Sequence, residues 1–261
     1  MKKLITILSF ILWLPTLALA QYDYDGTDDA HRVDNPNIGA TSGFSFCIRI
    51  NPDALSFGET IVNYGNGTDS SAGRGFALIH FFSNEMRFYG LSGATALKTG
   101  SDWGTLSTGT PFNVCVTVDG SQEMRAYVDG TLVRGPESYS GGFTAPNSTD
   151  DFLIGAVTPA FTSFGHAYWN GKLAHFAYWN TTLSGSDVTD YETNCPDTIQ
   201  AGSLQVFVPG TDNPATDQSS NTFGVTTLSA PTAGQGASFP SLPTCGAAAD
   251  NLPILQAIGE E

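Results

Sequence analysis

Apolar and polar residues alternate with a period of two along much of the chain. Phe44, Phe46, Ile48 and Ile50 share one side of an extended segment, and apolar residues repeat this pattern over residues 112–118. Such alternation is typical of strands with one buried face. The same character predicts further strands over residues 60–64, 75–82, 85–91, 124–128, 152–154, 171–179 and 204–208.

Turn residues and one helix signal complete the predicted fold. Stretches rich in Gly, Asn and Ser separate the strands, and Asp129-Gly130 is a dipeptide typical of tight hairpins. Residues 185–192 favour a helix, because Ser184 can cap it and Asp187 places negative charge in its first turn. The pattern therefore predicts an all-β fold, an antiparallel β-sandwich (jelly roll) with one short helix near the end of the domain.

The first twenty residues have the features of an export signal. Lys2 and Lys3 precede an apolar stretch over residues 4–17, and Ala18-Leu19-Ala20 offers a small-residue cleavage site. The mature chain is expected to be secreted, extracellular or periplasmic, without membrane insertion, because its apolar runs are too short to span a bilayer. We expect a signal peptide at 1–20, a β domain at 21–193, a Thr-, Ser-, Pro- and Gly-rich segment packed on that domain at 194–245, and a loosely held tail at 246–261.

The negative net charge of the chain excludes some classes of binding partner. The chain carries 25 acidic residues against 10 basic ones, a formal net charge of −15 at pH 7. Electrostatic repulsion makes nucleic acid and anionic membranes poor partners for such a chain. We therefore expect no nucleic-acid binding.

Four cysteines follow the export signal, and they predict two disulfides. An even number of cysteines in an oxidising compartment favours pairing, and none forms a C-x2-C zinc pattern. Cys47 and Cys115 each lie on the polar side of a predicted strand, so a bridge between them would cross the outer face of one sheet if the two strands are neighbours. Exclusion then pairs Cys195 with Cys245.

The run YDYDGTDDAHRV, which begins at Tyr22, places a glycine turn between two short segments that favour strands. Asp25-Gly26 is good turn chemistry, and Asp28 and Asp29 can accept hydrogen bonds from local backbone groups. The alternative is a calcium site that uses Asp25 and Asp28. Calcium takes six to eight oxygen ligands, so such a site would need partners from elsewhere in the chain.

Three stretches together resemble one known family. The run YDYDGTDDAHRVDNPNIGATSGFSFCIRINPD resembles its opening D-G-x-D-D turn and first long strand, FNVCVTVDGSQEMRAYVDGTLV resembles its paired strands, and WNGKLAHFAYWNTTLSGSDV resembles its closing strand and helix. These are the laminin-G-like and pentraxin-like jelly rolls of the concanavalin A-like lectin/glucanase superfamily, and the resemblance covers roughly residues 22–191. It implies a Cys47–Cys115 disulfide, as in pentraxins. The carboxylates of the pentraxin calcium site have no counterpart here, because no acidic residue lies between Asp151 and Asp187.

The sequence carries no catalytic pattern of this superfamily or of serine hydrolases. Glucanases of the superfamily use an E-x-D-x-x-E strand, which is absent, and no G-x-S-x-G elbow accompanies His31, His80, His166 or His175. His80 and His175 fall within predicted strands and are expected to be packing residues. We expect that the protein is not an enzyme.

Aromatic residues gather just before the closing strand, in the segment FTSFGHAYWNGK. Related domains place ligand-binding loops there, and flat aromatic faces suit sugar rings. The candidate ligand-binding residues are Trp103, Phe164, His166, Tyr168 and Trp169. In the alternative interpretation these rings plug the end of the sandwich. The resemblance implies recognition of a glycan or a surface protein, most simply carbohydrate binding or adhesion; the alternative is a structural module of a surface appendage or a virion.

Overall fold

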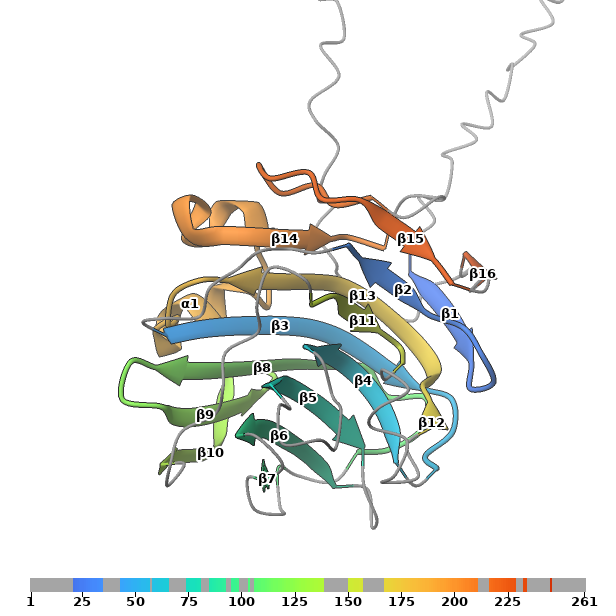
Figure 1. Cartoon of the computed structure of the whole chain (residues 1–261), viewed down its shortest axis with the longest axis horizontal. Helices are drawn as coiled ribbons and strands as arrows, with labels where there is room; N and C mark the ends of the chain where they lie inside the picture. Colours follow the sequence, from blue (N-terminus) through green and yellow to red (C-terminus); the bar gives the residue numbers. More distant parts are fainter. Residues whose placement is uncertain are drawn as a thin grey trace, which may run out of the picture.

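The computed structural model describes residues 21–34, 43–56, 58–65, 74–80, 85–92, 95–98, 103, 106–138, 150–156, 167–210, 216–228, 232–233 and 245. Figure 1 shows two curved sheets that face each other, with the short helix α1 beside one of them. Among the described residues, the strand pairs are antiparallel except that of β12 with β4. The predicted antiparallel β-sandwich is therefore confirmed. None of the helices in the described part of the chain has the length and apolar character that crossing a membrane requires.

The first sheet, sheet A, has the order β10-β9-β8-β3-β13-β1-β16, and β14 also pairs with β13. Its centre is built from β3, β8 and β13, the strands that carry the clearest alternation of apolar residues. Its strands are β1 (Tyr22–Asp25), β3 (Gly43–Pro52), β8 (Phe112–Asp119), β9 (Glu123–Val128), β10 (Thr131–Ser138), β13 (Asn170–Trp179), β14 (Leu204–Val208) and β16 (Thr232–Ala233).

The second sheet, sheet B, has the order β15-β2-β11-β4-β5-β6-β7, and β12 also pairs with β4. Strands from both ends of the described chain pair side by side here, because β15 lies against β2. Its strands are β2 (His31–Val33), β4 (Glu59–Tyr64), β5 (Arg74–His80), β6 (Met86–Ser92), β7 (Thr95–Lys98), β11 (Phe152–Ile154), β12 (Ala167–Tyr168) and β15 (Val225–Thr227).

Five strands carry no clear signal in the sequence: β7, β10, β12, β15 and β16. β10 shows why, because its side chains are exposed or only half-buried along its whole length. An edge strand that buries neither face has no need for alternating apolar residues. Within residues 194–245, β14 and β16 extend sheet A and β15 extends sheet B. The expected division of the chain into a signal peptide, a β domain, a packed segment and a tail stays a prediction.

Aromatic rings dominate the core between the sheets. Phe44 and Phe46 from sheet A stack on Phe76 of sheet B with ring centroids 4.9 and 5.1 Å apart. Tyr64 and Phe152, neighbours within sheet B, stack at 3.9 Å. Aromatic rings bury a large apolar area each, so this cluster is a major source of the stability of the sandwich.

The outer face of sheet A carries a second apolar cluster. Cys47 and Cys115 are paired in the register of β3 and β8, with Cα atoms 4.1 Å apart, and are joined by a disulfide. Their side chains point away from the main core, as the strand phase predicts, but they are not at the surface. They are buried among residues from the end of β13 onward, including Trp179, Tyr191 and Phe207. The second disulfide joins Cys195 to Cys245 at the same cluster.

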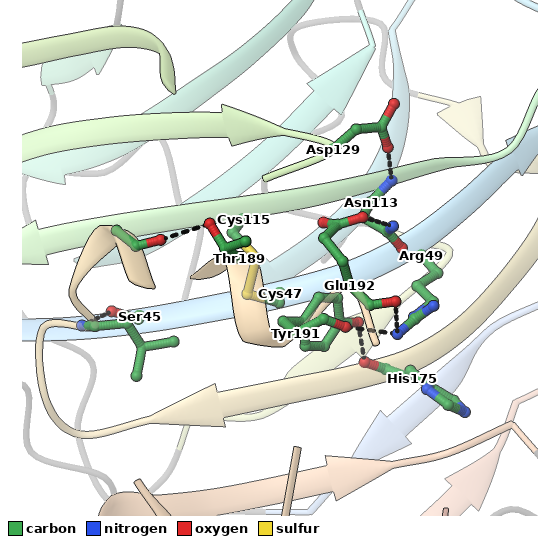
Figure 2. The surroundings of a disulfide bond; sticks show 12 residues. Ser45, Cys47, Arg49, Asn113, Cys115, Asp129, His175, Thr189, Tyr191 and Glu192 are labelled. Carbon is green, nitrogen blue, oxygen red and sulfur yellow. Dashed lines mark hydrogen bonds between the residues drawn. A yellow bond between two sulfur atoms is a disulfide. The ribbon is translucent and has the colours of Figure 1, made fainter. Parts of the chain in front are cut away.

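The helix α1 (Gly185–Asp190) is fixed at both ends. Ser184 and Asp187 form a capping box at its start. At its end, the Arg49 guanidinium donates from Nη2 to the Tyr191 carbonyl at 2.6 Å (Figure 2). This buried cation lies where the helix dipole is negative, which explains an arginine on the covered face of β3.

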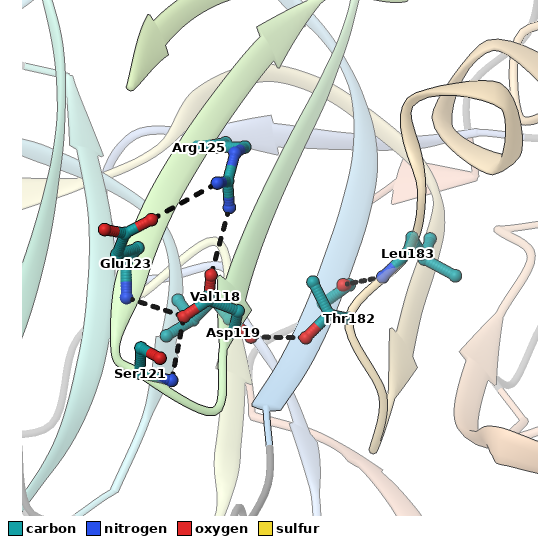
Figure 3. A network of polar contacts seen from close by, with 8 residues as sticks. Val118, Asp119, Ser121, Glu123, Arg125, Thr182 and Leu183 are labelled. Carbon is teal, nitrogen blue, oxygen red and sulfur yellow. Dashed lines mark hydrogen bonds and ion pairs between the residues drawn. The ribbon is translucent and has the colours of Figure 1, made fainter. Parts of the chain in front are cut away.

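A polar network fastens the hairpin β8–β9 at the same end of the sheet (Figure 3). The Asp119 carboxylate accepts the backbone N–H groups of Ser121 and Glu123 at 2.9 and 3.0 Å, and Arg125 donates to it at 3.2 Å. The Thr182 hydroxyl donates to the Val118 carbonyl at 2.9 Å. The segment that leads into α1 is thereby tied to β8.

Candidate ligand surface at the end of sheet B

The short strand β12 holds the part of the aromatic segment that the structure describes. Ala167 pairs with Glu59 and Tyr168 with Thr60, in parallel register with β4. The Trp169 N–H donates to the Gly155 carbonyl at 2.9 Å, and the Gly155 N–H donates to the Ile61 carbonyl at 2.9 Å. Because successive side chains of a strand point to opposite faces, Tyr168 turns outward and Trp169 turns into the core.

The predicted aromatic site divides into buried and exposed members. Trp103 and Trp169 are both 0% exposed and belong to the main core, so in this structure neither offers a ring face to a ligand. They fill the sandwich, as the alternative interpretation holds. Tyr168 is 38% exposed and is the only described aromatic residue among the large apolar side chains classed as exposed. Phe161, Phe164 and His166 lie outside the described residues.

Two titratable side chains that no sequence pattern connects, Glu59 of β4 and His80 of β5, meet at the part of β4 that pairs with β12. The Glu59 carboxylate and the His80 ring lie 3.7 Å apart between Oε2 and Nδ1, and both residues are 2% exposed. The His80 Nδ1 lies 2.8 Å from the Ser56 carbonyl oxygen, which assigns the ring proton to Nδ1. The Ser56 backbone and hydroxyl groups hydrogen-bond to the Glu59 carboxylate.

Burial governs the charge of this pair. It raises the pKa of Glu59 to about 7, although the hydrogen bonds from Ser56 act in the opposite direction. Burial also lowers the pKa of His80 below 6.5, against the effect of its hydrogen bond to Ser56. At neutral pH the imidazole is therefore neutral, and the contact with Glu59 is not an ion pair.

The acidic turn between β1 and β2 is compact. The carboxylates of Asp25, Asp28 and Asp29 each place an oxygen within 4.8 Å of the others. Asp25 Oδ1 accepts the Thr27 N–H at 2.7 Å, and Asp29 Oδ2 accepts the Asp25 N–H at 2.9 Å. These are hydrogen bonds from local backbone groups, as expected for a tight turn. They occupy one oxygen of the Asp25 carboxylate and one of the Asp29 carboxylate. Burial and the neighbouring carboxylates together raise the pKa of Asp29, against the effect of its backbone hydrogen bond.

His31 and His175 are packing residues. His31 is buried with its Nδ1 2.8 Å from the Tyr24 hydroxyl, and burial lowers its pKa to about 4. His175 lies in a bulge of β13 against Phe207, and burial together with the charge of Arg49 lowers its pKa to about 3. Both rings are therefore neutral parts of the fold at pH 7.

Solved structures share this architecture at low sequence identity. A putative carbohydrate binding protein from Bacteroides ovatus ATCC 8483 matches with a TM-score of 0.53 and 16% identity, over 80% of this chain and 62% of its own. The heptameric SAP-like pentraxin of Limulus polyphemus matches with a TM-score of 0.52 and 15% identity, over 66% of this chain and 81% of its own.

A third match is domain 4 of the extracellular arabinanase AbnA from Geobacillus stearothermophilus, solved in complex with arabinotriose. Its TM-score is 0.52 and its identity 14%, over 65% of this chain and 75% of its own. At such identities the likeness establishes the fold alone. No curated protein matches the chain.

A family model covers most of the sandwich. The model Laminin_G_3, described as the concanavalin A-like lectin/glucanases superfamily, matches residues 25–189. This range runs from the acidic turn after β1 into α1 and includes Glu59, His80 and Tyr168. The chain belongs to the Laminin_G_3 family of the concanavalin A-like lectin/glucanases superfamily.

Proposed function

We propose that this protein is an exported, non-catalytic recognition domain that binds carbohydrate through the surface around Tyr168. Membership of a lectin/glucanase superfamily supports the class of ligand. Among the neighbours in structure is a domain solved with arabinotriose. Export rests on the predicted signal peptide and on the two disulfides, which persist in oxidising compartments.

The observation that carries the proposal is the position of Tyr168. Its ring is 38% exposed on a strand whose backbone is fixed to β4 and Gly155. An exposed aromatic ring on a rigid element is a suitable anchor for a sugar, because the ring stacks on C–H groups while its hydroxyl remains free for hydrogen bonding. Trp169 beneath it is core, so the strand cannot rotate without breaking packing.

Calcium at the turn of Asp25, Asp28 and Asp29 is a secondary part of the proposal. Three close carboxylates supply hard oxygen ligands of the kind that calcium takes. Two of them already accept backbone N–H groups, and these hydrogen bonds use one oxygen of each carboxylate. We propose weak binding there at most, with Asp25 and Asp28 as the exposed ligands.

A role in assembly is the second candidate function, and the edge of sheet A favours it. β10 is the end strand of that sheet, and its Leu132 is 47% exposed. An open strand edge with an exposed leucine can pair with another chain. This edge is protected against such pairing, however, because β10 contains two register shifts, Pro136, and an ion pair between Arg134 and Glu137.

A glycan array probed with residues 21–261 tests the proposal, with arabinotriose included among the ligands. We expect specific binding to at least one class of glycan. No binding to any glycan, together with concentration-dependent self-association in analytical ultracentrifugation, would favour the assembly role. A Leu132→Ala variant separates the two, since it should reduce self-association and leave glycan binding unchanged.

A further inference from the structure

The Glu59–His80 pair joins β5 to the residue of β4 that lies beside the strand carrying Tyr168. Glu59 is the residue of β4 with which Ala167 pairs, and Thr60, its neighbour, pairs with Tyr168. His80 ends β5, and its carbonyl accepts the N–H of Gly58, just before β4. β12 is held to β4 by these two residue pairs. The first two residues of β4 are therefore the ones against which β12 is paired.

Each member of the pair has one buried polar atom without a hydrogen-bond partner. Glu59 Oε2 and His80 Nε2 are buried and make no hydrogen bond in the structure. A buried carboxylate oxygen without a donor is costly when the group is ionised and much less so when it carries a proton. His80 supplies no compensating charge at neutral pH, because burial lowers the pKa of its ring, and its Nδ1–H is directed to the Ser56 carbonyl rather than to Glu59.

The charged groups on the described elements around the pair have partners of their own. On β6, next to β5, Arg87 pairs with Glu85 at 3.1 Å, and Met86 stands opposite His80. In the connection from β3 to β4, Asp53 pairs with Lys172 of β13 at 2.5 Å. Beside β11, Asp151 lies 3.8 Å from Arg32. On β12 the titratable side chain is Tyr168. None of these described groups offers Glu59 a free cation.

We propose that Glu59 and His80 form a proton-binding pair that couples the attachment of β12, and with it the position of Tyr168, to pH. With a proton on Glu59, the neutral acid stays buried and β12 remains docked. When the proton leaves, the ionised carboxylate has no donor at Oε2, although Ser56 still donates to the group. It gains free energy by reaching water, and in this proposal it does so by separation of the start of β4 from β12. The link from β12 to ligand affinity rests on the proposed function, whereas the link from Glu59 to β12 does not.

The sign and the pH window follow from linkage. The folded pKa of Glu59, about 7, lies above its ordinary value of 4.5. The stabilisation of β12 is therefore fully present below pH 4.5, is lost as pH rises toward 7, and stays lost above it. Protection of the Trp169 amide against hydrogen exchange, corrected for the intrinsic rate, should fall by about tenfold or more between pH 5 and pH 7 and then level off.

The experiment combines two measurements on residues 21–261. Carbon-13 labelling of glutamate carboxyl groups should reveal one resonance that titrates near pH 7 and disappears in Glu59→Gln, an uncharged variant of the same shape. Hydrogen exchange should show the pH-dependent protection of Trp169 in the wild type and in the control Glu123→Gln, a partly exposed glutamate on β9 of the other sheet. It should be absent from Glu59→Gln.

Two results would overturn the inference. One is a wild-type spectrum in which every glutamate carboxyl titrates below about pH 5.5, near the ordinary value; this reading stands even if Glu59→Gln does not fold. The other is protection of Trp169 that falls equally in Glu59→Gln. Glycan binding is judged separately: a negative array removes the proposed function and leaves these two measurements unaffected, while a glycan ligand combined with pH-independent exchange removes only the inference.

Discussion

Replacing Trp169 by Ala should unfold the sandwich more readily rather than remove a ligand contact. The indole is 0% exposed and belongs to the main core. Truncation of a buried tryptophan costs about 3–5 kcal/mol, because it removes apolar burial and leaves a cavity. For an unfolding free energy of about 5–15 kcal/mol this is a large fraction. With a urea m-value of about 2–3 kcal/mol/M, the midpoint should fall by about 1–2 M.

Two further variants calibrate that loss. Trp169→Phe keeps a ring in the core and should cost only about 1–2 kcal/mol, because the indole N–H makes no hydrogen bond that could be lost. Leu132→Ala, at an exposed position on β10, should change stability by less than about 0.5 kcal/mol. The assay is urea unfolding followed by far-ultraviolet circular dichroism. If Trp169→Ala lowers stability by under about 1 kcal/mol and abolishes glycan binding, the ring lies at the surface in solution and our assignment to the core fails.

Three other predictions concern the disulfides, acid stability and the acidic turn. Peptide mapping without reductant should recover Cys47 with Cys115 and Cys195 with Cys245, and a Cys47–Cys195 link would contradict the strand alignment. The folded pKa of His31 lies below its ordinary value, so the free energy of unfolding should fall by on the order of 3 kcal/mol as pH falls from about 6.5 to 4. Thermal unfolding measured at several pH values checks this, and an equally steep pH dependence in His31→Gln would argue against it. Chelator should shift the melting temperature little, because three exposed or turn-bonded carboxylates give weak linkage, and a large drop rescued by calcium would show a full site.

The strands could be predicted from the sequence where only one of their faces packs in the main core. β3 and β8 lie in the middle of sheet A with their apolar side chains in the core, so the sequence alternates and also reveals the phase of Cys47 and Cys115. β10 and β12 could not be found this way. An edge strand needs no alternation, and a two-residue strand is too short to show any.

The candidate site could be predicted only in part. The aromatic segment stands out in the sequence, but period-two reasoning alone does not say whether Tyr168 or its neighbour Trp169 faces outward. The Glu59–His80 pair left no signal, because the two residues are opposite each other only in the register of β4 and β5. That register contains a shift between Thr60 and Val62, and a bulge cannot be placed from the alternation of the sequence.

The most direct test of carbohydrate recognition at Tyr168 is the calorimetric binding isotherm of Tyr168→Ala with the best glycan from the array. We predict that its binding free energy weakens by about 1–3 kcal/mol, which is a roughly 5- to 150-fold higher Kd, while its melting temperature stays close to that of the wild type. Leu132→Ala should bind as the wild type does. An unchanged isotherm for a folded Tyr168→Ala variant would contradict the account, and it would place the recognition surface elsewhere on the molecule.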